Sequence, residues 1–206
     1  MILLSGFDPF DGAEVNPSAE IVRAIDLDPP SGIEMTTTIL PVETGVAAER
    51  LLSMIEECGA DIVLMLGEAR GRSVISIEQV AINLLDFSIP DNAGRRVRDR
   101  AIDERGPDAL FSTLPVRAIV DMLVEEGIPA ERSLSAGAYL CNEISYRVLS
   151  HLRERVATGE RTSTAGFIHL PSLPDSSRVE DESPSGMPLD TGIRAVRSII
   201  EMLDRA

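Results

Sequence analysis

The chain has 206 residues, of which 44% are hydrophobic and 26% are charged, and its formal net charge is −15 at pH 7. This length fits one globular domain over residues 1–206 with a substantial core, and the negative charge argues against nucleic acid or an anionic membrane as a partner. No apolar run approaches the ~20 residues that span a bilayer, and the amino terminus lacks the basic region of a signal peptide, so we expect a cytoplasmic protein.

Strand-like and helix-like segments alternate along the chain, which predicts an α/β fold with a mainly parallel sheet. The apolar run over residues 2–7 predicts the first strand. Asn16-Pro17 predicts the start of a helix, because asparagine caps helices and proline suits their first position. In chain order, the patterns then predict a helix to residue 25, a strand over 33–40, a helix over 43–58 and a buried strand over 61–67.

The second half of the chain continues this alternation after a long loop. Residues 73–85 predict one strand or a pair of extended segments, and residues 86–108, rich in Pro, Gly, Asp and Arg, predict the loop. In chain order, the patterns then predict a helix over 115–126, a short strand over 133–136, a helix over 139–156, a buried strand over 165–171, a loop over 172–188 and a last helix over 189–203.

The two cysteines, Cys58 and Cys141, are too few for a disulfide framework or a four-cysteine zinc site. Cys58 lies in phase with the apolar residues of its helix, so we expect it to be a small buried hydrophobic residue. Cys141 follows a short strand and a turn at Gly137 and opens a helix, where unpaired N–H groups favour a thiolate and can bind an oxyanion. The alternative for Cys141 is a second core cysteine.

A nucleophilic cysteine needs a base within hydrogen-bond reach. His151 lies among charged residues of a helix and is expected at the surface, whereas His169 ends an apolar strand, at the edge where open α/β sheets bind ligands. Parallel strands would bring Cys141 and His169 to the same edge. Glu78, between apolar neighbours, is the candidate to orient the imidazole. The alternatives are a structural core histidine and a solvent-facing glutamate.

Six groups of motifs, in order, resemble those of pyroglutamyl peptidase I, the pyrrolidone-carboxyl peptidases: GFDPF with NPS, GEARGR, IEQVAIN, IPDN, SAGAYLCN and GFIHLP. They extend from Ser5 to Pro171. The resemblance implies a cytosolic cysteine exopeptidase that removes amino-terminal pyroglutamate from peptides. It also implies a single-domain α/β/α sandwich, a homodimer or homotetramer, and no metal or other cofactor. Position by position, it makes Cys141 the nucleophile, His169 the general base and Glu78 the acid.

The resemblance also explains two phenylalanines near the end of the first strand, in a chain with only five Phe, two Tyr and no Trp. It places Phe7 and Phe10 on either side of the flat, uncharged pyroglutamyl lactam, where stacking is worth roughly 0.5–1.5 kcal/mol beyond burial. Backbone groups near Glu68 and Ile89 would bind the lactam N–H and C=O. The alternative is that the two rings only close the edge of the sheet.

The chain departs from the common family pattern at positions that border the expected pocket, namely Glu68, Arg70, Gln79, Phe87 and Ser88. These changes leave the chemistry in place but bear on substrate preference, because a carboxylate at Glu68 or the lack of a cation at Ser88 changes the polarity next to the lactam. Two alternatives to the peptidase therefore remain: a thiol amidase acting on another small cyclic or acyl amide, and a non-catalytic ligand-binding relative.

Overall fold

The computed structural model describes residues 1–159, 163–174 and 186–205. In these residues the strands are β1 (Ile2–Phe7), β2 (Met35–Leu40), β3 (Ile62–Glu68), β4 (Ile75–Glu78), β5 (Val80–Ile82), β6 (Ala109–Phe111), β7 (Ala130–Ser133) and β8 (Thr164–Leu170). The helices are α1 (Pro17–Leu27), α2 (Val46–Cys58), α3 (Val116–Glu125), α4 (Leu140–Ala157) and α5 (Leu189–Asp204). Most of the loop predicted over residues 172–188 lies outside the described residues.

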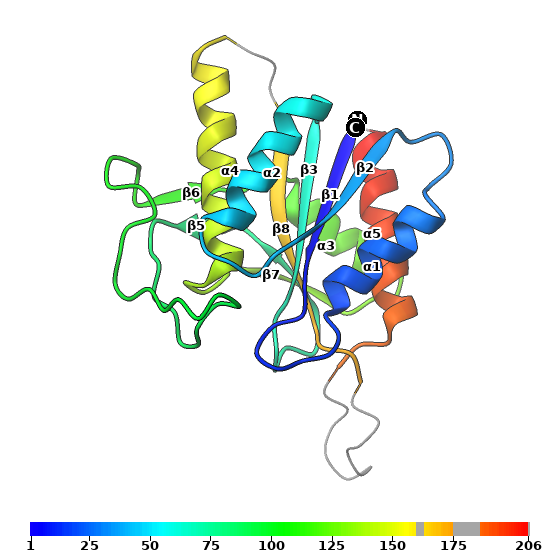
Figure 1. The fold of residues 1–206 in the computed structure, drawn as a ribbon. Coiled ribbons are helices and arrows are strands. Elements are labelled where there is room, and N and C mark those ends of the chain that lie inside the picture. Colours follow the sequence, from blue (N-terminus) through cyan, green and yellow to red (C-terminus); the bar gives the residue numbers. More distant parts are fainter. Residues whose placement is uncertain (160–162, 175–185, 206) are drawn as a thin grey trace.

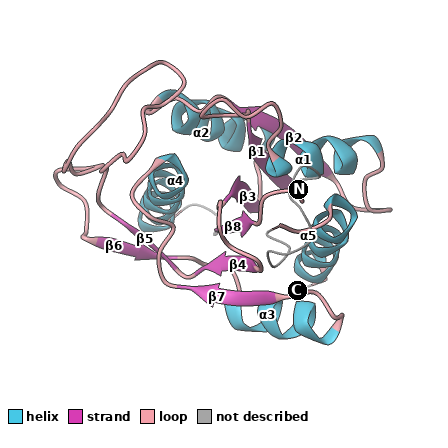
Figure 2. Cartoon of the chain, turned by 90° about the horizontal axis from the view of Figure 1, so that it is seen from below, coloured by secondary structure: helices cyan, strands magenta, loops and turns pink. Residues whose placement is uncertain are grey.

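The main sheet has six strands in the order β2-β1-β3-β8-β4-β7, and helices cover both of its faces. Figures 1 and 2 show α2 and α4 on one face and α1, α3 and α5 on the other. A small sheet of β5 and β6 packs against α4. The predicted fold class, an α/β/α sandwich with a mainly parallel sheet, is confirmed.

Alternate side chains of the central strands enter two separate hydrophobic clusters, one on each face of the sheet. On β1, Leu3 faces the cluster under α2 and α4, whereas Leu4 faces the cluster under α1, α3 and α5. On β3, Val63 and Leu64 divide in the same way. Burial on both faces explains why these strands are continuous apolar runs rather than alternating ones.

The start of α1 follows the prediction, whereas the start of α2 does not. Asn16 caps α1, since its side-chain oxygen accepts a hydrogen bond from the Ser18 N–H at 3.0 Å. The second helix was expected from residue 43 but begins at Val46. Gly45 has a φ of +78°, and its N–H donates to Glu143 on α4 at 3.1 Å, so the residues before Val46 are held in a non-helical turn.

The strands β4 and β7 differ most from the sequence-based expectation. The strand β4 is antiparallel to β8 and parallel to β7, so the outer part of the sheet is mixed. The short strand predicted over 133–136 is wrong, because β7 covers Ala130–Ser133 and residues 134–136 lie outside it. The segment 73–85 forms two strands that belong to different sheets.

The predicted loop over residues 86–108 contains no helix or multi-residue strand, but hydrogen bonds hold it in place. The buried carboxylate of Asp91 accepts from the N–H groups of Thr44, Ala93 and Arg95 at 2.8–3.0 Å. Burial alone raises the pKa of Asp91, but these donors and the Arg95 guanidinium outweigh it, so the pKa lies below its ordinary value. This loop is therefore an ordered wall of the molecule.

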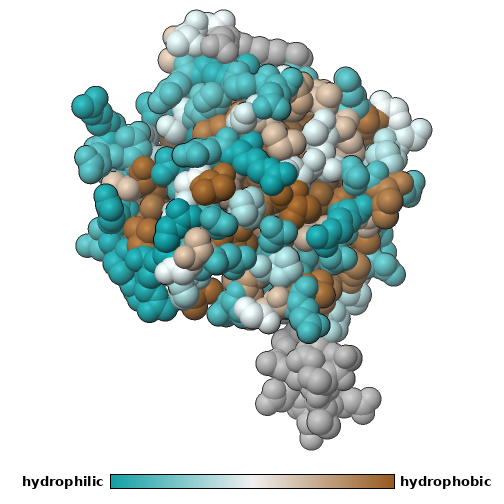
Figure 3. All heavy atoms as spheres, in the orientation of Figure 1, coloured by the Kyte–Doolittle hydropathy of each residue, from teal (hydrophilic) through white to brown (hydrophobic). Residues whose placement is uncertain are grey.

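The surface agrees with the acidic composition. Figure 3 shows one face of the molecule, on which hydrophilic side chains dominate and hydrophobic ones occupy smaller areas between them. Among the described residues, no helix combines the length and hydropathy needed to cross a membrane.

We predict that Asp91→Asn lowers the free energy of unfolding at neutral pH by roughly 1–3 kcal/mol, because the amide loses charge-assisted hydrogen bonds. The lowered pKa means that this stabilisation is present above the ordinary value of 3.8 and is lost as the pH falls below it. Urea unfolding at about pH 7 and about pH 3 measures the difference between wild type and variant, which should shrink in acid. Equal stabilities at neutral pH would contradict the role of Asp91.

Candidate active site

The candidate site lies where the carboxyl ends of β3 and β8 meet the amino-terminal end of α4. His169 is the penultimate residue of β8 and is 4% exposed. In the sheet register it pairs with Gly67 on β3 and with Ser76 on β4. The histidine thus belongs to the rigid centre of the sheet rather than to a loop.

Glu78, the last residue of β4, holds the imidazole. Its Oε1 lies 2.7 Å from Nδ1 of His169, and the two side chains are 1% and 5% exposed. Arg72 Nη1 donates to the same carboxylate oxygen at 2.8 Å. The solvent-facing alternative for Glu78 is therefore wrong, because its carboxylate is buried between two nitrogen partners.

The charges of this pair follow from its surroundings. Burial alone raises the pKa of Glu78, but the hydrogen bond to His169 and the Arg72 guanidinium lower it below its ordinary value. Burial and the nearby Arg72 charge lower the pKa of His169, against the opposing effect of Glu78. At neutral pH the pair is therefore a carboxylate and a neutral imidazole. Since a carboxylate accepts only, Nδ1 carries the proton and Nε2 keeps a lone pair.

Cys141 is the second residue of α4 and lies against the same pair of strands. A Cβ atom added to Gly67, the register partner of His169, would lie 3.0 Å from the Cys141 Sγ and 2.7 Å from the Phe167 ring. A side chain at position 67 would therefore clash with Phe167 and crowd the sulfur. Burial, and then the charge of Glu78, raise the pKa of the thiol to about 12, so the resting sulfur is protonated.

The route by which Cys141 reaches the site differs from the one predicted. The expectation relied on parallel strand ends, but β7 is parallel to β4 and β4 is antiparallel to β8. The segment 134–139 instead leads from β7 to the start of α4, with a turn at Gly137, whose φ is +78°. Arg72 Nη2 donates to the Ser135 carbonyl at 3.1 Å, so this arginine ties that segment to Glu78.

Sequence reasoning did not assign Arg72, although GEARGR was recognised as a motif. The usable signal was an arginine six residues before a glutamate set among apolar neighbours, where a buried carboxylate needs a counter-charge.

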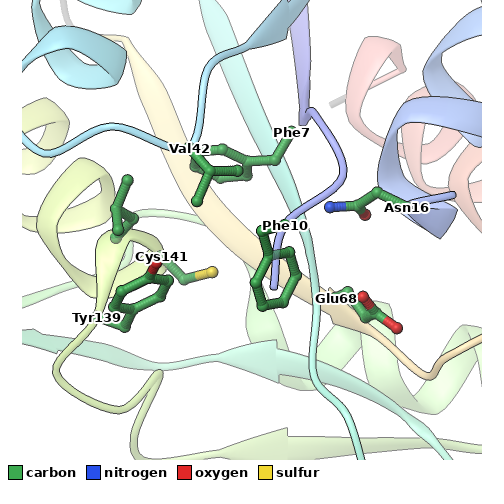
Figure 4. Close-up of a pocket in the computed structure, with 8 residues that line it drawn as sticks. Phe7, Phe10, Asn16, Val42, Glu68, Tyr139 and Cys141 are labelled. Carbon is green, nitrogen blue, oxygen red and sulfur yellow. The ribbon is translucent and has the colours of Figure 1, made fainter. Parts of the chain in front are cut away.

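A mainly apolar pocket, with about 310 Å³ of atom-free space that includes open solvent at its mouth, lies beside the sulfur. Figure 4 shows the Cys141 sulfur pointing toward Phe10, with Phe7 above Phe10 in this view. The residues that line the pocket are Phe7, Phe10, Asn16, Val42, Glu68, Tyr139, Leu140 and Cys141. The pocket thus brings together three of the predicted binding residues and the predicted nucleophile, while His169 and Glu78 do not line it.

The fourth predicted binding residue, Ile89, lies in the loop over 86–108 and does not line the pocket. Its neighbour Pro90 is in contact with the pocket wall, because the Tyr139 hydroxyl donates to the Pro90 carbonyl at 3.0 Å. Phe87 is buried and packs edge-on against Tyr139, with ring centroids 4.7 Å apart. Phe87 therefore supports the Tyr139 wall of the pocket.

Comparison with known proteins identifies the family. A family model described as "Pyroglutamyl peptidase" matches residues 1–206. The chain belongs to the pyroglutamyl peptidase family. A pyrrolidone-carboxylate peptidase from Coprothermobacter proteolyticus is 39% identical over 202 residues, which are 98% of this chain and 96% of that protein.

Solved structures of pyroglutamyl peptidase family members have the same fold. A crystal structure of a pyrrolidone carboxyl peptidase from Fervidobacterium islandicum AW-1 superposes with a TM-score of 0.89 at 37% identity, covering 99% of this chain and 98% of that one. The pyrrolidone carboxyl peptidase from Thermococcus litoralis superposes with a TM-score of 0.88 at 35% identity, covering 98% and 93%.

Glu68 directs its carboxylate away from Cys141 (Figure 4). Its Oε1 accepts from the Ser172 hydroxyl at 2.7 Å, and its Oε2 lies 3.6 Å from Nε of Arg70. The negative charge is therefore partnered on the far side of Phe10 rather than presented to the sulfur.

The remaining cysteine and histidine lie outside the pocket. Cys58 ends α2 and packs against the core cluster, but it is only partly buried rather than buried as predicted. His151 on α4 lies 2.7 Å from the Glu56 carboxylate. Within residues 1–159, 163–174 and 186–205, no three His, Cys, Asp or Glu side chains gather closely enough to hold a metal ion.

Proposed function

We propose that this protein is a cysteine exopeptidase that removes the amino-terminal pyroglutamyl residue from peptides, with Cys141 as nucleophile, His169 as general base and Glu78 as the orienting acid. The observation that carries the proposal is the buried 2.7 Å contact between Glu78 and Nδ1 of His169. Gly67, which pairs with His169 on the neighbouring strand β3, borders the Cys141 sulfur. Family membership supplies the substrate class.

The first step forms the tetrahedral intermediate that leads to the acyl-enzyme. The Cys141 sulfur attacks the carbonyl carbon that joins pyroglutamate to the next residue, while Nε2 of His169 takes the thiol proton. A thiol pKa of about 12 and a lowered imidazole pKa favour proton transfer during the attack over a thiolate formed in advance. Unpaired N–H groups in the first turn of α4 stabilise the oxyanion of the tetrahedral intermediate.

The second step releases the products. The imidazolium of His169, stabilised by the Glu78 carboxylate, gives its proton to the departing amine as the C–N bond breaks. Water then attacks the thioester carbonyl and loses a proton to His169, and the C–S bond breaks to free pyroglutamate. The sulfur takes back that proton, so Cys141 and His169 return to their resting forms.

Specificity follows from an apolar pocket beside the nucleophile. The lactam of pyroglutamate is flat and uncharged, so it can be buried against Phe7 and Phe10 without leaving a charge unpaired, whereas a protonated amino terminus cannot. We assign the lactam N–H and C=O to backbone groups near Glu68 and Ile89. The resemblance to the family also leads us to propose a cytoplasmic location and a homodimeric or homotetrameric assembly. Light scattering of the purified protein would test the assembly.

We predict that Cys141→Ser abolishes hydrolysis of a pyroglutamyl amide that releases a fluorescent amine, because a serine hydroxyl is a far weaker nucleophile in a site arranged for sulfur. The matched control is Cys58→Ser, which should keep nearly all activity. Prolyl and acetyl amides of the same fluorophore test substrate class and should be poor substrates for the wild type. Activity of Cys141→Ser comparable with wild type, or loss of activity in a folded Cys58→Ser, would refute the assignment.

The pH dependence of kcat/KM tests the state of the base. Because the pKa of His169 is lowered from 6.5, the imidazole stays neutral above that pH, and activity should fall only as the pH drops below it. Initial rates at low substrate concentration in buffers of constant ionic strength give the profile. An acid limb centred above about pH 7 would contradict a neutral, buried base.

A further inference from the structure

The guanidinium of Arg70 contacts the loop that carries Phe10 through several of its atoms. Nη1 donates to the Asp11 carboxylate at 2.8 Å, and Nη2 donates to the Phe10 carbonyl at 3.1 Å. The central carbon lies 4.4 Å from the centroid of the Phe10 ring, in the geometry of a cation–π contact. Nε lies 3.6 Å from the Glu68 carboxylate. Two of its nitrogens thus donate hydrogen bonds, and the third lies at ion-pair distance from a carboxylate.

The loop held by Arg70 is also fixed on the amino-terminal side of Phe10, where Asn92 Nδ2 donates to the Pro9 carbonyl at 2.9 Å, and it ends in a tight turn. Asp11 and Gly12 both have positive φ angles, +52° and +74°, and the Ala13 N–H donates to the Phe10 carbonyl at 3.0 Å, which closes a tight turn. The turn is exposed at Asp11 and Gly12. Asp-Gly is a favoured pair for a turn with two positive φ angles, so the turn forms locally, and contacts outside it, such as those of Arg70, fix where it lies.

Arg70 is itself fixed to the sheet. Its partner Glu68 is the last residue of β3, with a side chain only 6% exposed. The Ser172 hydroxyl, just beyond β8, donates to the same carboxylate at 2.7 Å. A continuous polar chain therefore joins the ends of β3 and β8 to the turn that places Phe10 next to the sulfur of Cys141 (Figure 4).

We propose that Arg70 is a positioning residue that sets substrate affinity by holding Phe10 against the pocket beside Cys141. The part of this proposal that concerns substrate rests on the proposed peptidase function. Arginine suits the role because its planar guanidinium can stack on a ring and donate in several directions at once, which the single ammonium of lysine cannot do. Arg70 and Asp11 are 40% and 47% exposed, so salt should weaken the contact.

The test compares Arg70→Ala and Arg70→Lys with wild type on a pyroglutamyl fluorogenic amide. Because Arg70 acts on binding and not on the reacting atoms, Arg70→Ala should raise KM about tenfold and leave kcat within about twofold. The KM of Arg70→Lys should lie between those of wild type and Arg70→Ala. Added NaCl should raise the KM of wild type but not that of Arg70→Ala. The matched control is Arg117→Ala, because Arg117 is 88% exposed and pairs only loosely with Asp121 at 3.9 Å.

A second measurement does not depend on turnover. In a Cys58→Ser background, iodoacetamide should alkylate Cys141 several-fold faster when Arg70 is alanine, because the Phe10 ring no longer covers the sulfur. Thermal melting of each variant separates this effect from general unfolding. Inactive wild type with faster alkylation of Arg70→Ala would refute the proposed function but support the placement of Phe10. Active wild type with unchanged KM and unchanged alkylation in Arg70→Ala would refute the role of Arg70.

Discussion

The hydrogen bond between Glu78 and Nδ1 of His169 is the interaction on which the site depends. Its two side chains are almost completely buried, where an unpaired charge would be strongly destabilising. Arg72 offsets part of that cost by donating to the same oxygen. With the proton fixed on Nδ1, the other ring nitrogen keeps its lone pair, so the buried imidazole is neutral and can accept a proton, as the role proposed for it requires.

The sheet and α4 supply the geometry around this bond. An antiparallel β4 places Glu78 beside β8, and a glycine at position 67 leaves the space that the Cys141 sulfur occupies. The pocket lies on the other side of the sulfur and is mainly apolar. A protonated thiol and a neutral imidazole place no net charge of their own next to this pocket. The arrangement therefore suits an uncharged group beside the Cys141 sulfur, as the proposed function requires.

Much of the fold and of the candidate site could be predicted from the sequence, because the features concerned are local. The start of α1 follows from Asn16 and its proline, and the two-sided burial of β3 follows from its apolar run. The strand β7 could not be placed in this way, since it is a short, polar edge strand without an apolar pattern. Strand direction is also absent from any local pattern, so the mixed sheet was missed. The contacts of Arg70 and Arg72 depend on long side chains that reach residues remote in sequence or in another element, which periodicity does not encode.

The tautomer of His169 tests the central claim most directly, and it can be measured by ¹⁵N NMR without any substrate. The chain has only two histidines, so His151 serves as an internal reference. At neutral pH we expect His169 to show a protonated Nδ1 and an unprotonated Nε2, and Glu78→Gln to shift this balance while the His151 signals stay unchanged. A wild-type His169 with its proton on Nε2, or a spectrum insensitive to Glu78→Gln, would contradict the account.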